Sequence, residues 1–364
     1  MHKTAAWPLA FVYMGLIVYA SLYPFAEWRD QGIAPWVFLT APLPKFWTGF
    51  DVAVNVVGYA PLGGLLALGA LRTNRLRHAI WAPLVLACVL SLAMEILQSY
   101  LPARVPSRED WLLNTSGALV GAIIALLLAR LGALDRWSQI RGRWFSPEAR
   151  GGIVLLALWP MALLFPAAVP FGLGQVLERV EEAIGDQLAD TPFLDWLPVR
   201  VTELQPLVPS AEMVCVMLGL LIPCLLSFCV IRSVARRAAS VWMVVGAGAA
   251  VTALSAALSW GPAHAWAWVS LQVEFGMVLA LVLAIGLAFV PWRASAALLL
   301  LALGVYLSLL NQAPESPYFA QTLRAWEQGR FIRFHGLAQW LGWLWPYATL
   351  FYVLSLLWRR DTKN

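Results

Sequence analysis

Residues 212–231 read EMVCVMLGLLIPCLLSFCVI, a stretch whose only charged residue is Glu212 at its start. An α-helix rises about 1.5 Å per residue, so about twenty apolar residues cross the hydrocarbon core of a bilayer. A run of this length and composition is typical of a transmembrane helix.

Nine further apolar runs accompany this one, which suggests about ten membrane-crossing helices. The ten segments lie at residues 7–25, 52–71, 79–101, 112–132, 152–172, 212–231, 240–259, 266–291, 294–310 and 336–358. Apolar residues make up 61% of the chain and charged residues 12%, which is about half the charged fraction of a soluble domain. The sequence therefore predicts an all-α, polytopic transmembrane helix bundle in a lipid bilayer.

Lys and Arg predict the orientation of these helices, because short cytoplasmic loops retain them. If the N-terminus is cytoplasmic, the inner side of the membrane receives sixteen of the 25 Lys and Arg residues. The outer loops then hold the other nine, together with most of the acidic residues. We therefore predict that both termini are cytoplasmic. The net charge of +5 follows from this topology, and no nucleic-acid partner is expected.

A polar, Arg-rich connector at residues 133–151 suggests two membrane domains, a four-helix domain at 1–132 and a six-helix domain at 152–364. The second domain has two long outer loops, 173–211 and 311–335. Within the first loop, residues 175–189 have one apolar and one acidic helical face, which indicates an amphipathic helix. It could lie on the membrane surface or pack as an ordinary loop helix. A similar apolar side in the second loop comprises Phe319, Leu323, Trp326 and Phe334.

Polar residues inside apolar helices cost a few kcal/mol each at membrane depth, so they mark sites of function. In the second and third helices they recur every three or four residues, which places them on one face of each helix. These residues are Asp51, Asn55 and Tyr59 in the second helix, and Ser91, Glu95 and Gln98 in the third. From the helical rise, Glu95 is expected about 9–10 Å below the outer end of its helix.

Further polar residues follow in the next turn and at the start of the fourth helix. They are Arg104, Ser107, Asp110 and Asn114. Gly117 and Gly121 then form a small-xxx-small pair, which lets another helix approach closely. We expect a single polar pocket open to the outer side of the membrane, with Glu95 at its floor and Arg104 and Asp110 at its rim.

Structural roles for the same residues remain open. Ser107 and Asp110 have the spacing of a capping box at the start of a helix. Asp51 could cap the second helix, and Glu95 could pair with Arg104 for structure alone.

The polar motifs resemble those of the VanZ-like membrane domain over roughly the first 130 residues. The resemblance rests on Ser21-Leu22-Tyr-Pro24, Asp51…Asn55…Tyr59-Ala-Pro61-Leu62-Gly63, Glu95-Ile-Leu-Gln98, Arg104-Val-Pro-Ser107-Arg-Glu-Asp110 and Asn114-Thr-Ser-Gly117…Gly121. The family often has His where this sequence has Asn55. The resemblance implies a multi-pass protein of the bacterial cytoplasmic (inner) membrane that acts on envelope lipids or lipid-linked glycans. It also implies a link to teicoplanin-type glycopeptide resistance, and it supplies no reaction.

Our leading hypothesis is that the pocket binds or moves an envelope lipid or lipid-linked glycan. Arg104 would contact a phosphate, and Glu95 and Asp51 would accept hydrogen bonds from sugar hydroxyls or ammonium groups. A proton-coupled carrier is a related possibility, for which Glu274, beside Gln272, is a secondary candidate within the C-terminal domain.

Two alternatives belong to other classes of protein. A membrane-embedded glycosyltransferase or hydrolase would need a carboxylate base, which either of two pairs could supply: Glu27 with Asp30, or Glu95 with Asp110. The sequence lacks a P-loop, a nucleophile elbow and a zinc-protease motif, which weighs against an enzyme. A non-catalytic scaffold for envelope assembly would instead use the outer loops. The Cys and His spacings suggest no metal site or cofactor, and the sequence leaves the oligomeric state open.

Overall fold

The computed structural model describes residues 6–23, 25, 27–42, 49–73, 78–165, 167–189, 191–193, 204–314 and 332–361. Within these ranges, the side chains of residues 50, 51, 134, 179, 182, 332–338, 360 and 361 are not described.

Ten apolar helices match the ten predicted segments. They are α1 (Ala6–Leu22), α2 (Gly49–Arg72), α3 (His78–Gln98), α4 (Arg108–Arg130), α6 (Arg150–Leu163), α8 (Pro209–Val230), α9 (Val234–Trp260), α10 (Leu271–Leu287), α11 (Trp292–Leu310) and α13 (Ile332–Asp361). Seven of the ten are long and apolar enough to cross a membrane, and α1, α6 and α10 are apolar but shorter. The predicted all-α polytopic fold is therefore confirmed. The cytoplasmic placement of the termini stays a prediction.

Two of the predicted segments were too long. The segment predicted at 152–172 contains α6, which ends at Leu163, and the chain then turns through Phe171 and Gly174 with left-handed φ values of 62° and 92°. The segment predicted at 266–291 contains α10, which begins at Leu271 after its N-cap, Ser270. Hydropathy alone cannot detect either boundary, because the residues outside the helices are also apolar.

The chain forms two compact units, Met1–Ile140 and Arg141–Asn364. The division falls inside the predicted connector, most of which forms a helix, α5 (Ala133–Trp144). The sequence predicted only a polar, Arg-rich connector here and no helix. Each unit is described by itself below.

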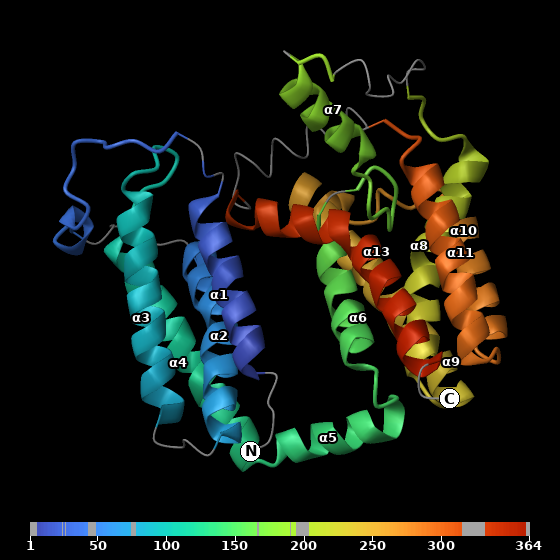
Figure 1. Cartoon of the computed structure of the whole chain (residues 1–364), viewed down its shortest axis with the longest axis horizontal. Helices are drawn as coiled ribbons and strands as arrows, with labels where there is room; N and C mark the ends of the chain where they lie inside the picture. Colours follow the sequence, from blue (N-terminus) through green and yellow to red (C-terminus); the bar gives the residue numbers. More distant parts are fainter. Residues whose placement is uncertain are drawn as a thin grey trace. The chain divides into compact units, whose positions relative to one another are not determined.

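In the N-terminal unit, α2 packs against α1, α3 and α4 (Figure 1). The contact between α2 and α4 is made backbone to backbone. A Cβ atom added to Gly63 would lie 1.9 Å from the carbonyl oxygen of Ala118, and one added to Gly121 would lie 1.8 Å from that of Ala60. Gly117 meets the α2 backbone in the same way. Because no side chain fits between these helices, residues on both sides of the contact are held close together.

In the C-terminal unit, α8 is the central helix, and α9, α10, α11 and α6 pack against it (Figure 1). Its side chains from Cys215 to Val230 are almost all buried. Helix α13 packs against α6 and α11. This core is apolar and combines large side chains, among them Trp159, Phe171 and Phe228, with alanines of α10 and α11.

The first long loop contains α7 (Leu177–Leu188), a helix within the amphipathic stretch that the sequence indicated. Leu177, Val180 and Ile184 on its apolar face are all more than 40% exposed. Placement of this helix on the membrane surface remains a prediction. In the second loop, Phe319, Leu323, Trp326 and the side chain of Phe334 lie outside the described residues.

Candidate functional site

Polar side chains of α2, α3 and α4 gather inside the N-terminal unit. We call this group the polar cluster, and its members are Asn55, Tyr59, Ser91, Glu95, Asp110 and Asn114. They come from the first half of α2, the second half of α3 and the first half of α4. Consecutive helices in this bundle run antiparallel, so these three portions lie at the same end of the unit (Figure 1).

Glu95 joins α3 to the start of α4. Its carboxylate is 2% exposed, and Oε2 accepts a 2.7 Å hydrogen bond from the backbone N–H of Ser107. Ser107 is the N-cap of α4, and its hydroxyl oxygen accepts hydrogen bonds from the backbone N–H groups of Glu109 and Asp110 at 3.1 and 3.4 Å. The carboxylate therefore lies at the N-terminal end of α4, where it binds one of the backbone N–H groups that the helix leaves free.

Glu95 is nearer to the helix end than we expected from the sequence. Residues 99 and 100 form a turn, so α3 ends at Gln98. Glu95 lies in the last turn of α3, about 5 Å from its end by helical rise rather than 9–10 Å. The cluster is thus shallower than the predicted pocket.

Two side-chain pairs connect the three helices. Asn55 Nδ2 donates a 2.7 Å hydrogen bond to Asp110 Oδ1, which joins α2 to α4. Asn114 Nδ2 donates a 3.0 Å hydrogen bond to Ser91 Oγ, which joins α4 to α3. Asn55, Ser91 and Asn114 are all buried. Interhelical bonds of this kind are a main source of helix association in lipid.

The Tyr59 hydroxyl is the exception in the cluster. Tyr59 is 5% exposed, and its hydroxyl makes no hydrogen bond within the described part of the chain. The hydroxyl lies close to the Ser91 side chain, and the carboxylates of Glu95 and Asp110 act on it electrostatically. A buried hydroxyl without a partner costs about 1–3 kcal/mol. Native structures usually satisfy such a group with ordered water or a ligand.

This end of the chain also matches a known family. Residues 7–129 match the family model VanZ-LLP1, described as VanZ/LLP1. The N-terminal unit carries a VanZ-like domain. The match covers about a third of the chain and contains the whole polar cluster and the glycine contact. No curated protein and no solved structure matches the chain.

Within the VanZ-like domain, Arg104 binds the end of α1. Its Nε and Nη2 donate to the carbonyl oxygen of Tyr23 at 3.2 and 2.8 Å, and Nη2 also donates to that of Ala20 at 3.2 Å. Gln98 Nε2 donates to the nearby carbonyl oxygen of Ser21 at 3.1 Å. A cation at the negative end of a helix is stabilising. The guanidinium therefore holds the α3–α4 turn against α1, a role that we did not expect.

Three further predicted candidates are Asp51, Asp30 and Glu27. Asp51 lies in the first turn of α2, and its side chain is outside the described residues. Asp30 is exposed, and its carboxylate accepts a local hydrogen bond from Gly32 N–H at 2.9 Å. Glu27 is also exposed.

Glu274 lies in the C-terminal unit, so it does not join the VanZ-like cluster. It is exposed in the first turn of α10, next to the N-cap Ser270. The sequence reading placed Glu274 well inside the membrane, because it took the helix to start at residue 266. The later start of α10 moves this carboxylate to the helix end.

Among the described residues, no group of three or more His, Cys, Asp and Glu side chains could hold a metal ion. The four cysteines are free, and three of them are buried. The chemistry available in the cluster is therefore hydrogen bonding and charge, supplied by two carboxylates, two amides and two hydroxyls.

Proposed function

We propose that the VanZ-like domain binds the polar headgroup of an envelope lipid or lipid-linked glycan at the polar cluster. The observation that supports this proposal is the buried Tyr59 hydroxyl, which lacks a hydrogen-bond partner in the described chain and on which the carboxylates of Glu95 and Asp110 act electrostatically. A ligand group at this position would satisfy the hydroxyl.

The charges of the cluster favour a headgroup that is rich in hydrogen-bond donors. Ionised carboxylates only accept hydrogen bonds, and Glu95 and Asp110 supply two of them. Sugar hydroxyls and ammonium groups are donors, and their bonds to carboxylates are strengthened by the charge. The proposal assigns no phosphate contact to Arg104, because its guanidinium binds the backbone at the end of α1.

The position of the cluster suits a ligand that enters from one leaflet. The cluster extends from Glu95 and Asp110 near the ends of α3 and α4 to Tyr59 near the middle of α2. The predicted topology turns the Glu95 and Asp110 ends outward in a bacterial inner membrane. A lipid-linked glycan held there would be at the surface where glycopeptide antibiotics meet cell-wall precursors. This is how the domain would contribute to teicoplanin-type resistance.

Native mass spectrometry of the protein purified from its own membranes in mild detergent tests the proposal. The variant is Tyr59→Phe, which removes only the unpartnered hydroxyl. The control is Tyr347→Phe, the same exchange in the C-terminal unit, where the hydroxyl donates to Gly174 O at 3.2 Å. We expect a bound lipid on the natural protein and on the control, and about three- to tenfold less on Tyr59→Phe, the effect of one hydrogen bond.

The mass of the released molecule identifies its headgroup and separates a phospholipid from a lipid-linked glycan. Glu95→Gln, measured in parallel, tests the donor-rich headgroup, because the amide keeps the shape and removes the charge. Equal lipid occupancy in the natural protein, Tyr59→Phe and Glu95→Gln would overturn the proposal.

A further inference from the structure

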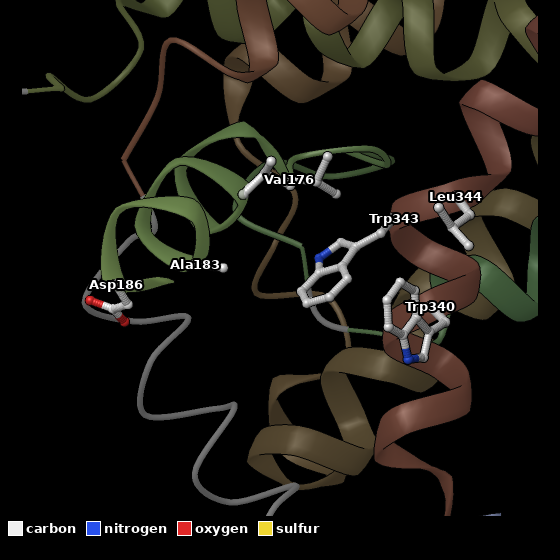
Figure 2. A pocket seen from close by; sticks show the side chains of 7 residues that line it. Val176, Ala183, Asp186, Trp340, Trp343 and Leu344 are labelled. Atoms are coloured by element: carbon white, nitrogen blue, oxygen red, sulfur yellow. The ribbon is translucent and has the colours of Figure 1, made fainter. Parts of the chain in front are cut away.

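A cavity of about 480 Å³ opens between α7 and α13 in the C-terminal unit. Its volume lies within the range of about 300–1,000 Å³ that small-molecule sites occupy. The described residues that line it are Val176, Val180, Ala183, Asp186, Trp340, Trp343 and Leu344 (Figure 2). None of these residues belongs to the VanZ-like domain.

The walls of the cavity are suited to an alkyl chain. One wall is formed by Val180 and Ala183 of α7 and by Val176, its N-cap, and Leu344 of α13 lies on the other. Figure 2 shows the Trp343 indole extending from α13 into the space between the two helices. Val180 and Leu344 are 46% and 50% exposed, so their apolar surface is open to an incoming molecule.

The same cavity has the features of a cation site. Trp340 and Trp343 form an edge-to-face pair with ring centroids 5.6 Å apart. Indole faces attract cations, and the attraction increases when the cation loses its water. Asp186 is the one charged side chain among the described lining residues, and it is negative.

From these features we infer that the cavity binds a cationic amphiphile, a molecule that joins a single alkyl chain to an ammonium group. The alkyl chain would lie along the apolar walls, and the ammonium group would lie in the cavity, which Asp186 lines at one end and the two indoles line at the other. This site is separate from the polar cluster, and it does not rest on the function proposed for the VanZ-like domain.

Equilibrium binding to the full chain in an uncharged, lipid-free amphipol tests this inference. The ligand is radiolabelled dodecyltrimethylammonium below its critical micelle concentration, with binding to empty amphipol particles subtracted. Dodecyl sulfate and dodecyl maltoside have the same chain with an anionic and a neutral head, so they isolate the contribution of the charge. We expect saturable binding of the cation, and at least tenfold weaker binding of both other amphiphiles.

Three variants locate the site. Asp186→Asn should weaken binding of the cation roughly two- to fivefold, as expected for a partly exposed charge pair. Trp343→Leu should weaken it roughly fivefold or more, because it removes an indole face. Glu274→Gln removes an exposed carboxylate elsewhere in the same unit and should leave binding unchanged. Equal binding of the three amphiphiles, or unchanged affinity in both Asp186→Asn and Trp343→Leu, would overturn the inference.

Discussion

The two units differ in what their buried polar side chains bind. In the C-terminal unit the buried Arg237 donates to the carbonyl oxygens of Ile231, Ala288 and Val290, all next to helix ends. Asn311 likewise bonds to backbone groups at residues 174, 176 and 177, where the chain turns. These side chains satisfy backbone groups that the helix breaks leave free, so their roles are structural.

In the VanZ-like domain, polar side chains of the cluster bond to one another. Asn55 binds Asp110, and Asn114 binds Ser91, while the hydroxyl of Tyr59 has no hydrogen-bond partner in the described chain. Glu95 of the cluster bonds to a backbone N–H, and the C-terminal unit has a buried side-chain pair of its own, Ser227 with Ser240. Under the proposed function, the feature that distinguishes the cluster is therefore the buried Tyr59 hydroxyl, which lacks a partner in the described chain.

The largest loss of stability is expected from a change in the glycine contact between α2 and α4 of the VanZ-like domain. In Gly63→Ala the new Cβ would lie 1.9 Å from the carbonyl oxygen of Ala118, so α2 and α4 must separate. We expect a loss of about 3 kcal/mol or more in the free energy of unfolding, at the upper end of overpacking costs. Unfolding by SDS in mixed micelles measures it. Gly58→Ala is the control in the same helix, because its Cβ would meet nothing within 4 Å. Equal stability of the two variants would contradict the backbone contact.

A smaller difference in stability is expected between variants of two carboxylates, Glu95 and Glu274. Glu95→Gln weakens a buried, charge-assisted bond to Ser107 N–H and should cost about 1.5–3 kcal/mol, the range for hydrogen bonds to charged groups. Glu274→Gln alters an exposed side chain and should change stability little. The same SDS unfolding measurement compares them. A larger loss for Glu274→Gln would show that α10 places this residue deeper than the structure does.

Variants of two tyrosines, Tyr306 and Tyr59, compare a hydrogen-bonded hydroxyl with one that lacks a partner in the described chain. The Tyr306 hydroxyl donates to Phe171 O at 2.7 Å and accepts from Leu173 N–H, so Tyr306→Phe leaves two buried backbone groups unsatisfied. We expect a loss of about 1–3 kcal/mol. Tyr59→Phe removes a hydroxyl without a partner in the described chain and should be neutral or slightly stabilising in ligand-free protein. Thermal unfolding after delipidation measures both, and a large loss for Tyr59→Phe would mean that its hydroxyl is structural.

The smallest difference is expected between two helix caps, one in each unit. Ser107 caps α4, and Ser270 caps α10 by accepting from Val273 N–H at 3.4 Å. Ser107→Ala and Ser270→Ala should each cost about 1 kcal/mol. Thermal unfolding in detergent compares them. If Ser107→Ala also lowers lipid occupancy, the serine contributes to binding; an unchanged occupancy leaves it as a cap.

The sequence predicted the fold well, because ten apolar runs are enough to locate ten helices. It also grouped the polar residues on three helix faces, because spacings of three and four residues define a face. The sequence could not show to which group each of these polar side chains is hydrogen-bonded. Arg104 binds carbonyl oxygens about eighty residues earlier in the chain, and no local pattern encodes such a contact. Glu95 and Glu274 were misplaced in depth, because hydropathy does not locate the residue at which a helix begins or ends.

The hydrogen bond between Asn55 and Asp110 has a consequence for biosynthesis. Its two partners are 55 residues apart in the chain, so α2 is made well before α4 emerges from the ribosome. Until then the Asn55 amide lacks this partner, and the α2 glycines lack the helix that covers them. We therefore expect the nascent α2 and α3 to stay at the insertion machinery until α4 is inserted. The VanZ-like domain would complete its fold only when this last helix enters the membrane.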